Sequence, residues 1–226
     1  MKLVLASAPS CAGKAIIKKI SELVGKRASE ISVAIINEAY AVESGDKRWL
    51  IDELGYISRK FGGEIDFVNL LALDIKEIQA RLDKADIVWC LGGSTDYLKS
   101  VIDKSGLSKL LPKLIETKVW VGSSAGSSVL GVRGSYKSNS VIYQGEVHEK
   151  QPLKYFEIVD SCIFPHIGGE FVPKNAFEIC ITESKENKYP VYALSDKSAI
   201  IVDGNKIYMI GKNSHKLENG EVTDKV

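Results

Sequence analysis

The chain has 226 residues, of which 45% are hydrophobic and 26% are charged, and its formal net charge is +1. This length and balance predict one globular domain over residues 1–226 and exclude a largely disordered chain. Lysine and arginine are spread along the sequence without forming a basic block, which argues against a nucleic-acid partner.

Apolar runs are short throughout the chain. None reaches the roughly 20 residues that a membrane-spanning helix needs, and no apolar signal-peptide segment follows the first residues, so we expect a cytoplasmic protein without a membrane partner. The 4 cysteines are widely separated, with no CxxC pair and no histidine at metal-ligand spacing, so we expect no metal. No surface stretch stands out as an interface, which leaves monomer and homodimer both open.

Apolar runs alternate with amphipathic segments through the first half of the chain. The expected strands lie at 2–7, 31–39 and 64–73, each followed by an expected helix, at 12–26, 47–62 and 75–85. The runs 85–91 and 119–122 are apolar at consecutive positions, as in central parallel strands that helices cover on both faces. The pattern predicts an α/β fold with a doubly wound, mostly parallel sheet, whose ligands bind beyond the carboxyl ends of the strands.

The second half of the chain is less regular. We interpret the polar stretch 131–154 as a loop that borders the site, with a short strand at 140–143. A helix is expected near 174–183. The apolar runs within 189–212 predict a β-meander that closes with a hairpin, whose turn lies at 203–205.

The residues Gly122-Ser123-Ser124-Ala125-Gly126 fit the G-x-S-x-G pattern of a nucleophile elbow, directly after an expected strand. Small flanking residues permit the tight turn, the serine hydroxyl projects from it, and the next backbone N–H can bind an oxyanion. Ser124 is therefore the candidate nucleophile and Ala125 a candidate oxyanion donor. The alternative is a helix start that Ser123 or Ser124 caps.

His166 is the candidate general base among the 3 histidines, because it follows an apolar run at an expected strand end. The alternative is a histidine with a purely structural role. Gly92 and Gly93 end the run 85–91, where a second backbone N–H can approach a substrate closely. The alternative there is a plain turn into a helix that Ser94 or Thr95 caps.

Four segments, LGGSTDYL, GSSAGSSVLG, FPH and the closing hairpin YALSDKSAIIVDGNKIYMIG, occur in the order found in the peptidase E (aspartyl dipeptidase) family of serine peptidases, relatives of cyanophycinase. The chain resembles this family from about residue 2 to residue 211. The resemblance implies a glutamine-amidotransferase-like (flavodoxin-like) three-layer fold with a C-terminal β-hairpin. It also implies Ser124 as nucleophile, His166 as base, and the N–H groups of Gly93 and Ala125 as the oxyanion hole.

The resemblance further implies an acidic residue in the loop after the nucleophile, where this chain has Asn139. An asparagine can orient the base, but it cannot stabilise an imidazolium by charge. Among the carboxylates between nucleophile and base, Glu146 ranks first as a substitute acid because a short apolar run precedes it. Glu149 and Asp160 are the other candidates.

The leading hypothesis is a serine peptidase that hydrolyses small peptides, as a dipeptidase does, through an acyl-enzyme on Ser124. This chemistry needs no cofactor. The replacement of the acid by Asn139 motivates an alternative, a non-catalytic or weakly active family member that acts as a binding or interaction protein. A third possibility is a hydrolase or acyltransferase on a non-peptide ester or amide.

Overall fold

The computed structural model describes residues 1–144 and 153–226. In its first half, one or more helices follow each of the first five strands. In chain order these elements are β1 (Lys2–Ala6), α1 (Pro9–Ala12), α2 (Lys14–Val24), the 3-10 helix η1 (Ala28–Glu30), β2 (Val33–Ile36), the 3-10 helix η2 (Glu38–Val42), α3 (Arg48–Lys60), β3 (Ile65–Phe67), α4 (Ile75–Lys84), β4 (Ile87–Cys90), α5 (Thr95–Lys104), α6 (Leu107–Thr117), β5 (Val119–Ser123) and α7 (Ala125–Ser128).

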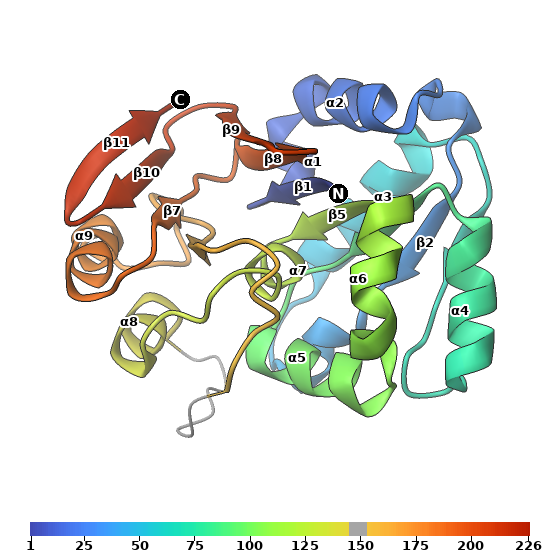
Figure 1. The fold of residues 1–226 in the computed structure, drawn as a ribbon, viewed down its shortest axis with the longest axis horizontal. Helices are drawn as coiled ribbons and strands as arrows, with labels where there is room; N and C mark the ends of the chain where they lie inside the picture. The colour runs from blue at the N-terminus through green and yellow to red at the C-terminus, as the bar shows by residue number, and fades with distance from the viewer. Residues whose placement is uncertain (145–152) are drawn as a thin grey trace.

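The remaining elements are α8 (Tyr136–Ile142), β6 (Cys162–Phe164), α9 (Ala176–Glu186), β7 (Val191–Ala193), β8 (Ala199–Asp203), β9 (Lys206–Ile210), β10 (His215–Glu218) and β11 (Glu221–Lys225). Figure 1 shows β7, β10 and β11 with α8 and α9 on one side of the molecule, and the helices of the first half around the larger sheet on the other.

The larger sheet has seven strands in the order β3-β2-β4-β5-β1-β8-β9. Strands β1 to β5 are mutually parallel, whereas β8 pairs antiparallel with β1, and β9 antiparallel with β8. Gly204, at φ 60°, lies in the turn between β8 and β9, as the sequence predicts. The doubly wound, mostly parallel α/β sheet with a closing hairpin is confirmed.

Apolar residues cover both faces of this sheet because successive side chains of a strand point to opposite faces. Leu3 and Leu5 of β1 belong to the core that packs against α4, α5 and α6. Val4 and Ala6 belong to the opposite core, which packs against α2 and α3. The sheet is therefore the middle of three layers, and polar groups are left for the strand ends.

The second sheet has four strands in the order β11-β10-β7-β6, with its own apolar core against α8 and α9. It corrects two predictions. Strand β7 pairs parallel with β6 and antiparallel with β10, and not with β8 in a meander; Val191 and Ala193 of β7 pack in the apolar core of this second sheet. Residues 140–142 lie in helix α8 and residue 143 ends it, so this segment does not form a strand. The helix forms here because the Ser135 hydroxyl accepts a hydrogen bond from the Ser138 N–H and caps its start.

No helix in residues 1–144 or 153–226 is long and apolar enough to cross a membrane.

Candidate active site

Ser124 occupies a sharp turn between β5 and α7. Its φ of 50° lies in the left-handed region, which non-glycine residues rarely adopt, and its N–H donates to the carbonyls of Ala6 and Ser7, each at 3.0 Å. The flanking glycines are required by close packing: a Cβ on Gly122 would lie 2.5 Å from the Gly126 oxygen, and one on Gly126 would lie 2.0 Å from the Cys90 oxygen. The G-x-S-x-G spacing thus follows from a turn whose backbone leaves no space for side chains.

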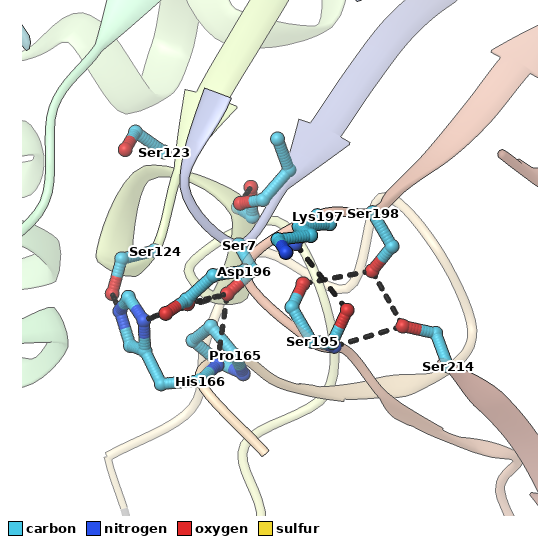
Figure 2. Close-up of polar contacts among 12 residues, drawn as sticks. Ser7, Ser123, Ser124, Pro165, His166, Ser195, Asp196, Lys197, Ser198 and Ser214 are labelled. Carbon is cyan, nitrogen blue, oxygen red and sulfur yellow. Dashed lines mark hydrogen bonds and ion pairs between the residues drawn. The ribbon is translucent and has the colours of Figure 1, made fainter. Parts of the chain in front are cut away.

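The Ser124 hydroxyl points to His166 and does not cap α7. The His166 Nε2 atom lies 2.9 Å from Ser124 Oγ, and the opposite ring nitrogen, Nδ1, lies 2.6 Å from Asp196 Oδ1 (Figure 2). His166 also has a left-handed φ, 66°, and its side chain keeps 23% exposure. A hydroxyl, an imidazole and a carboxylate therefore form one hydrogen-bonded chain, open to solvent at the ring.

The pairing of β6 with β7 brings His166 and Asp196 together. Phe164 of β6 is in register with Ala193 of β7, and the Ile167 N–H donates to the Leu194 carbonyl at 2.9 Å. Because the two strands are parallel, the residues that follow them emerge at the same edge. The hydrogen bond with His166 lowers the pKa of the Asp196 carboxyl, against the opposing effect of burial, so Asp196 is held as a carboxylate.

Buried serines fix the turn that carries Asp196. The Ser214 hydroxyl accepts a hydrogen bond from the Ser195 N–H at 2.8 Å, and the Ser198 hydroxyl donates to the Ser195 carbonyl at 2.9 Å. Ser198 and Ser214 are fully buried and their hydroxyls are bonded to each other, as Figure 2 shows. These hydrogen bonds connect the turn to Ser214, which directly precedes β10. They therefore restrict the movement of Asp196 away from His166.

The prediction that Asn139 stands beside the base, in the place of the triad acid, is corrected. Asn139 is buried in α8 and its side-chain amide donates to the carbonyls of Gly134, at 2.8 Å, and Ser135, at 3.1 Å. These bonds close the start of the helix, whereas the place beside His166 Nδ1 belongs to Asp196. Glu146, the substitute acid, and Glu149 lie outside the described residues.

Sequence reasoning missed Asp196, although a signal was present. Asp196 lies two residues after the apolar run 191–194, which contains β7, just as His166 lies two residues after the end of β6. The segment was assigned to a meander, and in a meander Asp196 is an ordinary turn residue.

The Gly92-Gly93 turn lies directly beside Ser124. A Cβ on Gly92 would be 3.2 Å from Ser124 Cβ, and Gly93 has a φ of 133° and packs so tightly that a Cβ would lie 2.3 Å from the Ala39 carbonyl carbon. Ser94 caps α5 by accepting from the Tyr97 N–H at 3.3 Å, so the turn also starts a helix. Ala125 begins α7, and the first N–H groups of a helix have no acceptor within it.

Further carboxylates surround the imidazole. Glu43 and Glu53 both interact electrostatically with His166, and burial raises the pKa of each carboxyl. Glu53 reaches from α3 to the back of the elbow, where it accepts hydrogen bonds from Trp89 Nε1 at 2.9 Å and from the Ser123 hydroxyl at 3.0 Å. Two further titratable carboxyl groups are therefore electrostatically coupled to the imidazole, and burial favours the neutral form of each.

A buried ion pair lies at the start of α5. Arg133 Nε and Nη2 donate to the two carboxylate oxygens of Asp96, at 3.1 and 2.9 Å, and the Tyr155 hydroxyl donates to the same carboxylate at 2.7 Å. This ion pair fixes the segment after α7 against the helix that follows the Gly92-Gly93 turn.

No group of three or more metal-ligating side chains gathers within residues 1–144 and 153–226. A serine hydroxyl that an imidazole can deprotonate, at the strand ends of an α/β sheet, is the arrangement of serine hydrolases.

Comparison with known proteins identifies the family. The model of peptidase family S51 matches residues 3–210, so this chain belongs to that family of serine-type peptidases. An uncharacterized peptidase of Listeria innocua is 28% identical over 204 residues, which cover 89% of each chain. An uncharacterized peptidase of Pasteurella multocida is 25% identical over 82% of this chain and 86% of its own. Peptidase E of Streptomyces coelicolor is 27% identical over 61% of this chain and 57% of its own.

Solved structures share the fold. A Listeria monocytogenes protein assigned to peptidase E superimposes with a TM-score of 0.75 at 18% identity, over 94% of this chain and 98% of its own. A peptidase from an acI-B1 Actinobacterium superimposes with a TM-score of 0.69 at 18% identity, over 96% and 91% of the two chains. The chain therefore shares its α/β fold with these peptidase structures, as the resemblance in the sequence implies.

Proposed function

We propose that this peptidase hydrolyses small peptides through an acyl-enzyme on Ser124, with His166 as general base and Asp196 as the orienting acid. The observation that carries the proposal is the continuous chain from Ser124 Oγ through both nitrogens of His166 to Asp196, with distances of 2.9 and 2.6 Å. Hydrogen-bond contact of nucleophile with base, and of base with a third group, is the geometric signature of this chemistry.

In the first step, His166 Nε2 takes the hydroxyl proton while Ser124 Oγ bonds to the carbonyl carbon of the peptide. The carbonyl oxygen becomes an oxyanion, which we assign to the N–H groups of Gly93 and Ala125 at the nucleophile elbow. His166 then gives its proton to the leaving amine as the C–N bond breaks. A water molecule, deprotonated by the same imidazole, releases the acyl group and restores Ser124.

Asp196 is the charged partner of His166 that could not be identified from the sequence. A carboxylate at Nδ1 fixes the tautomer that leaves Nε2 free to accept the proton, and it stabilises the imidazolium that then forms. The alternative of a binding protein without activity was motivated by Asn139, and that motive is lost because Asn139 bonds elsewhere.

Small peptides are proposed as the substrate class because the resemblance to peptidase E implies dipeptides. Experiment must determine which side chains the enzyme prefers in its peptide substrates. Dipeptides with acidic, neutral and basic side chains are therefore all tested. A dipeptide library read by release of free amine covers these cases, and an ester library run in parallel tests the non-peptide alternative.

The direct test is labelling with a fluorophosphonate, which reacts with an activated serine, followed by mass mapping of the label. We expect the label on Ser124, and its loss in Ser124→Ala together with the loss of dipeptide hydrolysis. Ser123→Ala is the matched control: its hydroxyl donates to Glu53, so we expect this variant to keep the label on Ser124. Label or turnover that persists in Ser124→Ala contradicts the proposal.

A further inference from the structure

Ser7 lies between Ser124 on one side and His166 and Asp196 on the other. It directly follows β1, which pairs on one side with β5, the strand before Ser124, and on the other with β8, the strand after Asp196. The register places Ala6 opposite both Ser123 and Ala199. Ser7 is fully buried, and its N–H donates to the Ser198 carbonyl at 3.2 Å.

The atoms of Ser7 contact each member of the hydrogen-bonded chain. Its carbonyl oxygen accepts from the Ser124 N–H at 3.0 Å, its hydroxyl oxygen accepts from the His166 N–H at 2.8 Å, and its hydroxyl donates to Asp196 Oδ1 at 3.0 Å. The hydroxyl oxygen also lies 3.5 Å from His166 Nδ1. Figure 2 shows this hydroxyl between the His166 backbone and the Asp196 carboxylate.

We propose that Ser7 is a positioning residue, whose hydroxyl holds His166 and Asp196 in the geometry that activates Ser124; this inference rests on the proposed function. A serine hydroxyl suits the place because it can accept and donate a hydrogen bond at the same time. The accepted bond anchors the backbone of His166, whose left-handed φ persists only where the surroundings hold it. The donated bond leaves Asp196 Oδ1 directed at the ring.

Ser7 acts through other residues, so a test must separate positioning from plain stability. Ser184 is the matched control, because it is equally buried and its hydroxyl also accepts one bond, from the Gly220 N–H at 3.1 Å, and donates one, to the Ile181 carbonyl at 2.9 Å. It lies in α9 and takes no part in the chain from Ser124 to Asp196. Ser184→Ala therefore measures what the loss of a buried hydroxyl does to folding alone.

The experiment is the second-order rate constant of fluorophosphonate labelling at Ser124, measured across the pH range in which histidine titrates. In Ser7→Ala we expect labelling to slow by about tenfold to a hundredfold, the effect of a reacting group displaced by up to about 1 Å. We also expect the acid limb of the profile to move to higher pH, because Asp196 without the Ser7 donor attracts a proton on the ring more strongly.

The other charged groups near the ring, Glu43 and Glu53, are unchanged in these variants, so a moved limb reports on Asp196. In Ser184→Ala we expect the wild-type rate and the wild-type limb. In Asp196→Asn, adding Ser7→Ala should slow labelling by less than it does in the wild-type background, because the two changes affect one interaction. Equal slowing in both backgrounds, or a wild-type rate and limb in Ser7→Ala, overturns the proposal.

A second variant keeps the proposal testable if Ser7→Ala folds poorly. A second measurement keeps it testable if the proposed function fails. Ser7→Cys keeps a side chain of similar shape with a weak donor, and we expect a smaller slowing in the same direction. The NMR resonance of the His166 Nδ1–H proton needs no turnover, and we expect it to move in Ser7→Ala or Ser7→Cys and to stay in Ser184→Ala. If wild type does not label but this resonance moves, the proposed function fails and the positioning role stands; an unmoved resonance overturns the role of Ser7.

Discussion

The first 130 residues and the last 70 or so contribute to the site in different ways. In the first region, each parallel strand of the larger sheet runs into a turn and a helix, and two neighbouring strand ends supply Ser124 and the Gly92-Gly93 turn. In the C-terminal region, the chain leaves the smaller sheet after β7 and joins the larger one at β8. His166 and Asp196 come from the ends of strands in the smaller sheet.

The turn that carries Ser124, the proposed nucleophile, is thus a local product of the fold, whereas its contact with His166 and Asp196 depends on how the two sheets meet. The elbow at Ser124 needs only a strand, a helix and small flanking residues. The imidazole and the carboxylate reach it only because β8 continues from the smaller sheet and pairs with β1. The predictions below separate these two contributions.

The largest expected effect belongs to the partner from the smaller sheet. We expect Asp196→Asn to lower kcat by about 10⁴-fold, the loss found when the aspartate of a Ser-His-Asp triad becomes an amide, because the amide favours the wrong tautomer of the base. The measurement is turnover of the best dipeptide from the library, with fluorophosphonate labelling as a second readout.

Asn139→Ala is the control for this prediction. It removes two hydrogen bonds from the start of α8 and should lower the free energy of unfolding by roughly 1–3 kcal/mol while kcat per folded molecule stays unchanged. A large loss of kcat in Asn139→Ala with near-normal turnover in Asp196→Asn would reverse the assignment.

The next effect concerns the turn from the larger sheet. A methyl group on Gly93 would lie 2.3 Å from the Ala39 carbonyl carbon, at a φ of 133° that an alanine rarely adopts. We expect Gly93→Ala to lower the unfolding free energy by roughly 1–3 kcal/mol and to slow labelling of Ser124 by about 10²- to 10³-fold, the range for the loss of one oxyanion donor. Chemical denaturation and labelling rates measure the two effects.

Gly204→Ala is the matched control, because Gly204 also has a positive φ but has open space around its Cα. It should cost roughly 1 kcal/mol of stability and leave labelling unchanged. Equal slowing in both glycine variants would mean that the Gly93 turn has no specific part in the reaction.

The smallest effect concerns Glu53 behind the elbow. Burial raises the pKa of this carboxyl in the folded state, so its contribution to stability is present below the pKa of an unfolded glutamate and is lost as pH rises through the folded pKa. Glutamine does not titrate and can still accept from Trp89. We therefore expect Glu53→Gln to gain stability relative to wild type as pH rises, measured by urea denaturation on both sides of the carboxylate range. If the unfolding free energy of Glu53→Gln relative to wild type stays constant or falls as pH rises, the assigned burial of the Glu53 carboxyl is contradicted.

The larger sheet was predictable because its evidence is local. Apolar runs of β-branched residues, each followed by an amphipathic segment, specify parallel strands covered by helices. The candidate residues Ser124, His166, Gly93 and Ala125 all stand at element ends that such patterns reveal. The helix α8 was missed because its polar residues show no clear periodicity.

The sequence by itself determined the α/β fold, the tight turn at Ser124 and the short list of histidines, since each depends on residues close together in the chain. Only the tertiary structure decided which carboxylate faces His166. Asp196 is far from Ser124 along the chain and follows a three-residue strand, and its place depends on β7 pairing with β6 and not with β8. A short strand can pair with several partners at similar local cost, so the choice rests on packing of the whole C-terminal core. Ser7, near the start of the chain, contacts all three residues because β1 pairs with β5 on one side and with β8 on the other.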